Sequence, residues 1–304
     1  MQRTVGLISL GCAKNRVDSE QMLGLLGQGS YALVNDPSEA EILIVNTCGF
    51  IESAKEEAID TLLEMAQYKK TGRCRLLVAT GCLVQRYGAD LKEQMPEIDV
   101  LLGVGEYPRL LDALEQGLDG KRPMYCGRTQ EVFSGPRVLT TPGYSAYVRI
   151  GDGCDNRCSY CAIPIIRGGY RSRSMESVLS EAELLAGQGV RELTYIAQDT
   201  TRFGDDMPPH AGRLPELIRR TCAIEGLEWV RVLYCYPSRV NDALLEALAR
   251  ESKACPYLDL PLQHIDADLL RAMNRQGSPE AIRSLLHRAR SMGLTLRTTL
   301  IVGF

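Results

Sequence analysis

The sequence predicts an α/β protein: an open parallel α/β sheet domain at the N-terminus, followed by a partial (β/α) barrel domain. Three observations lead to this fold class. Short apolar runs alternate with segments of helix length in both halves of the chain, which is typical of parallel sheets covered by helices. Residues 120–143, rich in Pro, Gly, Thr and Arg, interrupt the alternation. Groups of cysteines follow the expected strands. We therefore expect an N-terminal domain at residues 1–125, a linker at 126–143 and a barrel domain at 144–304.

The elements of the first half follow from their apolar runs. Strands are expected at residues 5–10, 41–45 and 75–79. A helix is expected from about Val17, because Asp18 and Glu20 suit the positive end of a helix dipole. A second helix is expected at residues 51–69.

The second half restarts the alternation with five apolar runs. Strands are expected at residues 145–150, 192–197, 229–236, 257–262 and 295–302, and helices at 175–188, 241–250 and 279–292. Repeated strand–helix units are typical of a (β/α) barrel, whose function lies on the loops at the carboxyl ends of its strands. The chain stops at Phe304 directly after an apolar run, so we expect a truncated barrel that lacks at least one further strand.

The composition narrows the class of protein. The 304 residues are 45% hydrophobic and 24% charged, enough to bury a sizeable core. No apolar run has the length of a membrane span, and the N-terminus lacks the pattern of a signal peptide. Eleven cysteines in such a chain read as thiols and metal ligands, so we expect the reducing cytoplasm. A net charge of −3 gives no overall attraction to nucleic acid.

Cys154, Cys158 and Cys161 lie within eight residues, in a loop that Gly153 opens. Three thiolates at this spacing point to one metal centre, and ligation by thiolates alone fits an iron–sulfur cluster. A cubic cluster held by three thiolates keeps one iron open for a small molecule. A closed structural zinc site needs four ligands. The alternatives are therefore a zinc knuckle completed by a distant residue, or a fortuitous group of cysteines.

Cys12, Cys48 and Cys82 each follow an expected strand of the first half. The carboxyl ends of parallel strands share one edge of a sheet, where open α/β sheets bind ligands. We therefore expect a second three-thiolate site there, and the alternative is three buried apolar cysteines. The remaining cysteines are given no role: Cys74, Cys126, Cys222, Cys235 and Cys255.

The arrangement Cys154-x3-Cys158-x2-Cys161, with the aromatic Tyr160 before the last cysteine, resembles the signature of radical S-adenosylmethionine enzymes. In that superfamily the three cysteines hold a 4Fe–4S cluster, and its open iron binds S-adenosylmethionine. Electron transfer then cleaves the sulfonium to a 5′-deoxyadenosyl radical. The resemblance implies that the cofactor carries the radical chemistry while the protein positions it.

Motifs in both halves resemble the methylthiotransferase family of this superfamily. In the first half they are Gly-Cys-Ala-Lys-Asn-Arg-Val-Asp-Ser-Glu at residues 11–20, Asn-Thr-Cys-Gly-Phe at 46–50 and Thr-Gly-Cys at 80–82. In the second half they are Ile163-Pro164, Arg167-Gly168, Ser172-Arg173 and Pro261-Leu-Gln-His264. The resemblance implies a second 4Fe–4S cluster on Cys12, Cys48 and Cys82. Ile265 and Asp266 depart from the family, where small residues are common at these positions.

Residues 12–20 and the run Ala-Gln-Asp-Thr-Thr-Arg-Phe-Gly at 197–204 resemble the family branch that modifies ribosomal small-subunit protein S-twelve. The resemblance implies a methylthio group added to an aspartate β-carbon. S-adenosylmethionine would be both radical source and methyl donor, and a cellular electron donor would be a partner. An aspartate β C–H bond is unactivated, so a radical is suited to break it. The alternative is the same reaction on a tRNA adenosine, whose branch usually has Asn at position 199.

The resemblance also suggests cofactor contacts. Gln198, Asp199 and Thr200 follow the second barrel strand, where the superfamily contacts the methionine amino group; a plain turn is the alternative. Gln263 and His264 end a strand and would border the adenosine, unless the histidine is structural.

Charged residues near the two cysteine groups have two interpretations. Arg167, Arg171 and Arg173 would hold a carboxylate by bidentate hydrogen bonds, or form a solvated basic face. Asn15 and Asp18 would shape the second cluster site, or cap the first helix.

Two other classes of function use the same cysteines: an electron-transfer or metal-storage module with two clusters, and a zinc-based structural protein. Family members also carry a C-terminal TRAM domain, a small β-barrel used in substrate docking, which these residues do not include. We therefore expect any ribosome or RNA contact through such a missing domain, and no membrane partner.

Overall fold

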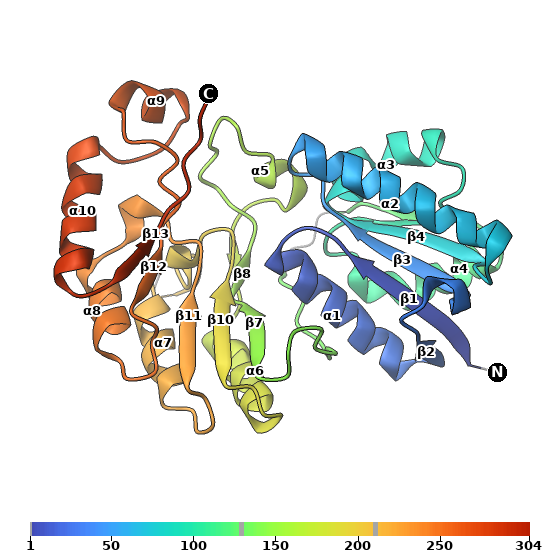
Figure 1. The fold of residues 1–304 in the computed structure, drawn as a ribbon, viewed down its shortest axis with the longest axis horizontal. Helices are drawn as coiled ribbons and strands as arrows, with labels where there is room; N and C mark the ends of the chain where they lie inside the picture. Colours follow the sequence, from blue (N-terminus) through green and yellow to red (C-terminus); the bar gives the residue numbers. More distant parts are fainter. Residues whose placement is uncertain (1, 128–130, 209–211) are drawn as a thin grey trace. The chain divides into compact units, whose positions relative to one another are not determined.

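The computed structural model describes residues 2–127, 131–208 and 212–304, and the chain forms two compact units (Figure 1). Unit 1 comprises Met1–Thr140 together with Ile165–Arg167, and unit 2 comprises Thr141–Pro164 and Gly168–Phe304. The division at residue 140 lies inside the segment that the sequence marks as a linker, while the domain limits given above stay a prediction.

Unit 1 is built on the open parallel sheet that the sequence predicts. In the described residues the sheet has six strands in the order β2-β1-β3-β4-β5-β6, and each pair is parallel. The strands are β1 (Arg3–Ser9), β2 (Tyr31–Leu33), β3 (Ile42–Thr47), β4 (Leu76–Gly81), β5 (Val100–Leu102) and β6 (Met124–Tyr125). Every residue of β3 and β4 is buried, because helices cover both faces of a parallel sheet.

The helices of unit 1 form two cores with the sheet. They are α1 (Ala13–Gln28), α2 (Glu52–Thr71), α3 (Cys82–Gln94) and α4 (Leu110–Leu118), with the 3-10 helices η1 (Pro37–Glu39) and η2 (Tyr107–Arg109). Leu43 of β3 belongs to the core that α2 and α3 complete, and its neighbour Ile44 belongs to the core of α1 and α4. Successive strand residues point to opposite faces, so the helices lie on both sides of the sheet.

The start of α1 differs from the prediction. The helix begins at Ala13 and not near Val17. Cys12 occupies the N-cap position without a side-chain hydrogen bond to the helix, so none of the usual capping residues marks the start. Asp18 and Glu20 consequently lie inside the helix, where both are buried. The helix α3, which begins directly at Cys82, was not predicted either.

The segment before residue 140 is fastened to α1. Oε1 of Glu20 accepts hydrogen bonds from the backbone N–H and the hydroxyl of Thr140, at 2.8 and 3.0 Å. The N–H of Val138 donates to the carbonyl oxygen of Glu20 at 3.0 Å. Gly24 permits this close approach, since a Cβ there would lie 2.1 Å from the carbonyl oxygen of Pro136. The end of the predicted linker is therefore part of the packing of unit 1.

Unit 2 contains the expected arc of parallel strands. They are β7 (Ser145–Arg149), β10 (Glu192–Ile196), β11 (Trp229–Val232), β12 (Tyr257–Asp259) and β13 (Thr295–Arg297). The order β11-β10-β7 forms one sheet and β12 pairs with β13. A parallel bridge between Val230 and Ala254, and a hydrogen bond of 3.0 Å from the N–H of Cys235 to the carbonyl of Asp259, link the two groups. This arrangement fits the predicted partial barrel.

Helices surround this arc of strands in Figure 1. They are α6 (Met175–Gly187), α7 (Leu214–Cys222), α8 (Asp242–Arg250), α9 (Ala267–Ala272) and α10 (Pro279–Ser291), with η3 (Thr200–Arg202) and η4 (Pro237–Arg239). The short helix α5 (Ile163–Ile166) and the antiparallel pair of β8 (Gly151–Asp152) and β9 (Arg171–Ser172) flank the cysteine loop. Among the described residues, no helix combines the length and the apolar character that crossing a membrane requires.

Three strands of unit 2 end at least three residues earlier than predicted. β11 ends at Val232 and not at residue 236, β12 ends at Asp259 and not at residue 262, and β13 ends at Arg297 and not at residue 302. Tyr234 has a positive φ of 62°, and its N–H is bound by Oδ2 of Asp259 at 2.8 Å. A left-handed residue turns the chain out of the strand ladder, so apolar character alone overestimated the length of the strand.

We expect the packing of α1 against the segment at Pro136 to be sensitive to a single methyl group. Gly24→Ala should destabilise the protein by about 1–3 kcal/mol, because overpacking displaces the neighbouring backbone. Gly27→Ala is the matched control in the same helix, since a Cβ there meets nothing within 4 Å. It should leave stability unchanged or raise it by up to about 1 kcal/mol. Urea unfolding followed by circular dichroism measures both variants, and equal midpoints would contradict the contact.

Candidate functional site

Cys12, Cys48 and Cys82 lie at the carboxyl edge of the sheet in unit 1. Cys12 precedes α1 shortly after the end of β1, Cys48 directly follows β3, and Cys82 is the first residue of α3 after β4. Since β1, β3 and β4 are neighbours in the sheet, the three cysteines meet at one edge, although 70 residues separate the first from the last. Their role as ligands stays a prediction.

Glycines beside the cysteines let the three loops approach one another. Gly11 has a φ of +86°, and a Cβ on it would lie 2.9 Å from Cβ of Cys48. Gly49 would place a Cβ 2.7 Å from Cα of Leu83. Real Cβ atoms are not found this close to backbone or side-chain carbons, so glycine is required at both places. The crowding brings the thiols of Cys12 and Cys48 and the start of α3 together.

Arg167 supplies a buried positive charge to this thiol site, and it belongs to the short segment 165–167 that packs with unit 1. Its Nη2 lies 2.8 Å from Oδ2 of Asp18, 3.0 Å from Oδ1 of Asn15 and 3.7 Å from Sγ of Cys82. Tyr107 donates a further hydrogen bond to Oδ2 of Asp18 at 3.2 Å. The structure therefore places Arg167, Asn15 and Asp18 beside the predicted ligands.

The thiols of unit 1 differ in acidity because their surroundings differ. Burial raises the pKa of Cys82 to about 11, although Arg167 opposes the shift. Burial also raises the pKa of Cys48. At Cys12 desolvation acts in the same direction, but the charges of Lys14 and Arg167 and the N–H groups at the start of α1 outweigh it, and the pKa is lowered. Cys12 raises the pKa of both Cys48 and Cys82, and Cys48 raises that of Cys82, as expected for three sulfurs that lie close together.

In unit 2 the cysteine loop lies between β8 and β9. The N–H of Cys154 donates to the carbonyl of Gly168 at 3.0 Å, and the N–H of Cys161 donates to the carbonyl of Cys158 at 3.0 Å. Gly153 has a φ of +76°, and a Cβ there would lie 2.1 Å from the carbonyl oxygen of Gly169. Burial, together with the charges of Asp199 and the neighbouring thiols, raises the pKa of Cys154 to about 11, although the N–H of Asn156 opposes the shift. Burial also raises the pKa of Cys161.

Residues 272–274, at the end of α9 and directly after it, hold this loop by hydrogen bonds. The N–H of Ser159 donates to the carbonyl of Met273 at 3.0 Å, and its hydroxyl donates to the carbonyl of Ala272 at 3.0 Å. The side-chain amide of Asn274 donates to the carbonyl of Arg157 at 2.9 Å. No pattern in the sequence predicts these contacts, because their partners lie more than one hundred positions apart.

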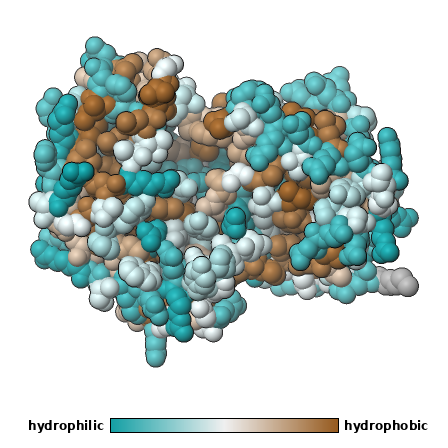
Figure 2. Space-filling model, in the orientation of Figure 1, coloured by the Kyte–Doolittle hydropathy of each residue, from teal (hydrophilic) through white to brown (hydrophobic). Residues whose placement is uncertain are grey.

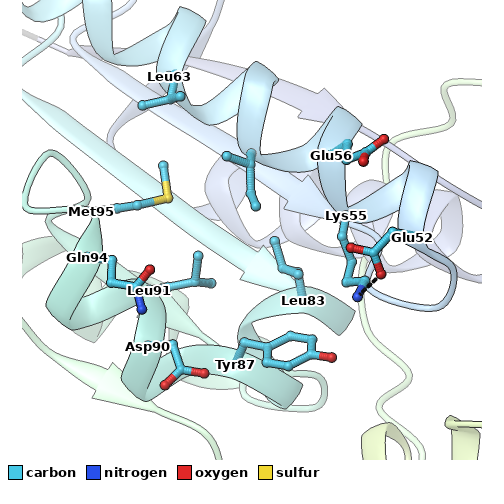
Figure 3. A pocket seen from close by; sticks show the side chains of 11 residues that line it. Glu52, Lys55, Glu56, Leu63, Leu83, Tyr87, Asp90, Leu91, Gln94 and Met95 are labelled. Atoms are coloured by element: carbon cyan, nitrogen blue, oxygen red, sulfur yellow. Dashed lines mark ion pairs between the residues drawn. The ribbon is translucent and has the colours of Figure 1, made fainter.

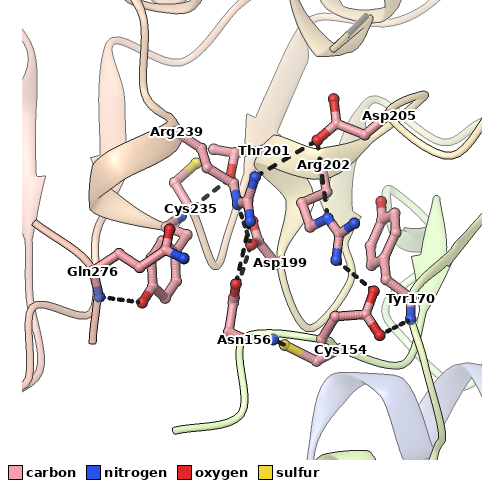
Figure 4. A network of polar contacts seen from close by, with 12 residues as sticks. Cys154, Asn156, Tyr170, Asp199, Thr201, Arg202, Asp205, Cys235, Arg239 and Gln276 are labelled. Carbon is pink, nitrogen blue, oxygen red and sulfur yellow. Dashed lines mark hydrogen bonds and ion pairs between the residues drawn. The ribbon is translucent and has the colours of Figure 1, made fainter. Parts of the chain in front are cut away.

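A polar network connects the cysteine loop with the ends of β10 and β11 (Figure 4). Oδ2 of the buried Asp199 accepts a hydrogen bond from the amide of Asn156 at 3.0 Å and lies 3.5 Å from Nε of Arg239. Thr201 donates to the other carboxylate oxygen. Burial raises the pKa of Asp199, and these partners oppose the shift. Asp199 therefore holds the cysteine loop in place.

The residues predicted to contact the cofactor fall into two groups. The hydroxyl of Thr200 donates to the carbonyl of Leu233 at 2.8 Å, and Nδ1 of His264 accepts from the N–H of Asp266 at 2.9 Å, so both have structural contacts. The side-chain amide of Gln198 is buried and finds no hydrogen-bond partner among the described residues. Such an amide normally has a partner, so Gln198 is suited to bind a ligand group.

Gln263 lies four residues after the end of β12, where an isolated bridge pairs it with Leu300, and its backbone conformation is unusual. Its φ is +71°, and its N–H and carbonyl pair with Thr299 and Ile301 at 2.9 and 2.8 Å. A non-glycine residue in this region is uncommon and is often found at a functional site. The contact with adenosine that the family implies for Gln263 and His264 stays a prediction.

The arginines expected to hold a ligand carboxylate have protein partners instead. Arg173 pairs with Glu181 and donates to the carbonyl of Arg149 at 3.0 Å. Arg171 donates to the carbonyl of Gly169 at 2.7 Å. Arg167 forms a buried ion pair with Asp18. These contacts favour a structural role for the three side chains.

The donor set of both groups fits a cubic iron–sulfur cluster better than a single ion. In the part of the chain that the structure describes, no three His, Cys, Asp or Glu side chains come close enough to hold one metal ion. Ligation by thiolates alone is typical of iron–sulfur clusters. The chemistry of these two groups of three cysteines therefore suits two such clusters, and their role as ligands stays a prediction.

Comparisons with known proteins agree with this chemistry. The chain matches the uncharacterized protein family UPF0004 over residues 4–103 and the radical SAM superfamily over residues 148–304. The radical S-adenosylmethionine methyltransferase TsrM from Kitasatospora setae shares the fold, with a TM-score of 0.71 and 16% identity over 100% of this chain and 70% of that chain. The cobalamin-dependent S-adenosylmethionine radical enzyme OxsB has a TM-score of 0.66 and 13% identity over 98% of this chain and 49% of that chain. Fold and thiol loops together define a radical S-adenosylmethionine enzyme.

Curated relatives narrow the class further. Proteins named ribosomal protein uS12 methylthiotransferase RimO are 51% identical in Clostridium botulinum, over 99% of this chain and 68% of the relative. The relative in Desulforamulus reducens is 49% identical over 99% of this chain and 69% of its own length. The chain therefore belongs to the RimO family of radical S-adenosylmethionine methylthiotransferases, which confirms the resemblance seen in the sequence.

The buried pair of Arg167 and Asp18 should be important for the stability of unit 1. Arg167→Met leaves a buried carboxylate without its guanidinium partner, which typically costs about 3–5 kcal/mol. Arg16→Met changes an exposed arginine in the same unit and should shift the free energy of unfolding by no more than about 0.5 kcal/mol. Urea unfolding of the purified protein compares them. Indistinguishable midpoints would mean that the ion pair contributes nothing.

Proposed function

We propose that this chain transfers a methylthio group to ribosomal protein uS12, and that Cys154, Cys158 and Cys161 hold one 4Fe–4S cluster while Cys12, Cys48 and Cys82 hold a second. The observation that carries this proposal is the pair of three-thiol sites, in a chain about half identical to uS12 methylthiotransferases over nearly all its length. Three thiolates on a cubane leave one iron without a protein ligand. Both sites can therefore bind a small molecule at that iron.

Cys154, Cys158 and Cys161 would hold the first cluster, which would supply the electron for the reductive cleavage of S-adenosylmethionine. The protein's part is to hold the loop rigid, through Asn156, Asp199 and Arg239 on one side and Ser159 on the other. The unpartnered amide of Gln198 would bind the amino-acid part of S-adenosylmethionine. Rigid positioning of this kind is what a cofactor enzyme contributes to the chemistry.

The substrate atom would be the β-carbon of an aspartate, whose unactivated C–H bond calls for a radical. The names of the relatives favour uS12 over the tRNA adenosine that the sequence left open. We further propose a cellular electron donor and a cytoplasmic site of action, because the substrate is a ribosomal protein and all eleven cysteines are free thiols. We also propose, as the family resemblance implies, that a C-terminal domain of the kind found in family members makes any additional contact with RNA.

Mass spectrometry of uS12 tests the proposed reaction. A strain that lacks this protein should have uS12 without the methylthio group, while its tRNA keeps the usual modification. Restoring the gene should restore the mass of the modified aspartate. A change confined to tRNA adenosine would contradict the proposal and support the alternative substrate.

Replacing the two cysteine groups separately should divide the reaction into its parts. With Cys154, Cys158 and Cys161 changed to alanine, the anaerobic protein should fall from about eight irons to about four and release no 5′-deoxyadenosine. With Cys12, Cys48 and Cys82 changed to alanine, it should lose the same amount of iron, still release 5′-deoxyadenosine and no longer modify uS12. Cys126→Ala, outside both groups, is the control and should change nothing. Release of 5′-deoxyadenosine by the first variant would refute the assignment.

A further inference from the structure

A groove separates α2 and α3 on the outer face of unit 1, and its volume is 490 Å³ (Figure 3). Apolar side chains line it: Ile59 and Leu63 of α2, Leu83, Tyr87 and Leu91 of α3, and Met95 directly after α3. Ile59 and Leu63 are both exposed, and hydrophobic residues are visible on the surface of this unit in Figure 2. An apolar groove between two helices is the usual receptor for the apolar face of another peptide.

Acidic residues line the sides of the same groove. Glu52 and Glu56 of α2 and Asp90 of α3 contribute carboxylates. Lys55 is the basic residue in this lining, and it pairs with Glu52 and lies 5.5 Å from the centre of the Tyr87 ring. The segment 52–64 of α2 carries five acidic residues and one lysine. The groove therefore combines an apolar floor with a negative rim.

The groove begins at the thiol site. Leu83, which lines the groove, directly follows Cys82, and Glu52 lies four residues after Cys48. Gly49 touches Leu83, as the close approach of a Cβ there shows. Phe50 and Ile51, between Cys48 and α2, are large apolar residues that remain exposed. The groove lining at Glu52 and Leu83 therefore follows closely in the chain on Cys48 and Cys82.

We propose that this groove binds a segment of uS12 that is rich in Lys and Arg and carries apolar anchor residues, and so presents the protein substrate to unit 1. This inference rests on the proposed function. A ribosomal protein binds RNA by neutralising phosphates with Lys and Arg, so its surface is positive and complements Glu56 and Asp90. Its apolar residues would occupy the floor beside Leu63, and rim charges would guide the encounter.

Charge reversal in the groove tests the proposal. Binding of purified, fluorescently labelled uS12 to the cluster-loaded enzyme is measured by anisotropy at low salt. The variant Glu56→Lys/Asp90→Lys should bind uS12 at least about tenfold more weakly, because two attractive contacts become repulsive. In methylthiolation assays its KM for uS12 should rise while kcat stays unchanged, since these residues touch no reacting atom.

The matched control is Glu64→Lys/Glu93→Lys. It makes the same change of net charge on the same two helices, at exposed positions outside the groove lining. Its affinity for uS12 should stay within about threefold of the wild-type value. A third variant, Leu63→Asp, keeps the groove acidic but removes its apolar floor, and it should also weaken binding. Iron content and release of 5′-deoxyadenosine without uS12 should be normal in all three.

Different results would contradict docking in the groove and the proposed reaction on uS12. If the wild-type enzyme modifies uS12 and the groove and control variants bind it equally well, the groove is not the docking site. If sedimentation shows that the groove variants instead lose self-association, its occupant is a second copy and the proposal is overturned. If the wild-type enzyme does not modify uS12 at all, the proposed function itself fails.

A second observation, independent of the groove, concerns Arg275 in unit 2. Its Nη1 lies 3.7 Å from Sγ of Cys158 and 3.2 Å from the hydroxyl of Tyr160, and its Nη2 donates to the carbonyl of Pro261 at 2.7 Å. The guanidinium also lies 4.6 Å from the centre of the Tyr236 ring. These contacts fix a positive charge beside a predicted cluster ligand.

The geometry points to Arg275 as a positioning residue that raises the reduction potential of the cluster on Cys158. Hydrogen bonds and positive charge at the ligating sulfur stabilise the reduced, more negative form of a cluster. Arg275→Met should therefore shift the potential to more negative values, with iron content retained. Arg275→Lys keeps the charge and should restore part of the shift.

Redox titration followed by electron paramagnetic resonance measures these potentials in the anaerobic protein. The cluster on Cys12, Cys48 and Cys82 serves as the internal reference, and its potential should not move. An unchanged potential in Arg275→Met would overturn the role. So would an equal loss of iron in both variants, because that result would mean that Arg275 only holds the loop.

Discussion

The common direction of the strands is the constraint on which the rest of unit 1 depends. Because β1, β3 and β4 are parallel neighbours, the chain leaves each of them at the same edge of the sheet. That geometry turns three cysteines separated by more than thirty residues into one thiol site. The glycines at 11 and 49 complete it, since side chains at these places would force the loops apart. The cores on both faces, which bury every residue of β3 and β4, keep this edge fixed.

A buried charge then sets the electrostatic environment of that edge. The buried ion pair of Arg167 with Asp18 lies against Cys82, so a positive charge is ready where thiolates would gather. Arg167 comes from the segment that follows the other cysteine loop, yet it packs as part of unit 1. The loop of Cys154 is held differently, by the network of Asp199 and by the hydrogen bonds of residues 272–274. Hydrogen bonds and an ion pair thus position both cysteine groups, and such positioning is what the protein contributes to a cofactor-dependent reaction.

The groove between α2 and α3 and the side chain of Arg275 both lie near predicted ligands. The groove of α2 and α3 starts at the residues that follow Cys48 and Cys82, and Arg275 touches Cys158 itself. Substrate recognition and control of the cluster potential would therefore depend on neighbours of the cysteines. This proximity follows from the fold, because loops at strand ends carry functional residues while the strands and helices hold the loops in position.

The sequence by itself determined the fold class and the family, because apolar periodicity and local motifs are properties of neighbouring residues. The same motifs predict the six cysteines as ligands. The prediction failed at two element ends: α1 begins at Ala13, after an N-cap Cys12 that gives no capping signal, and the N–H of Tyr234 binds Asp259 beyond the end of β11. Only the tertiary structure decided that Arg167 serves Asp18 and that Asn274 and Arg275 reach the cysteine loop. Residues more than one hundred positions apart form no periodic pattern in a sequence, because only the packing of the folded chain brings their side chains together.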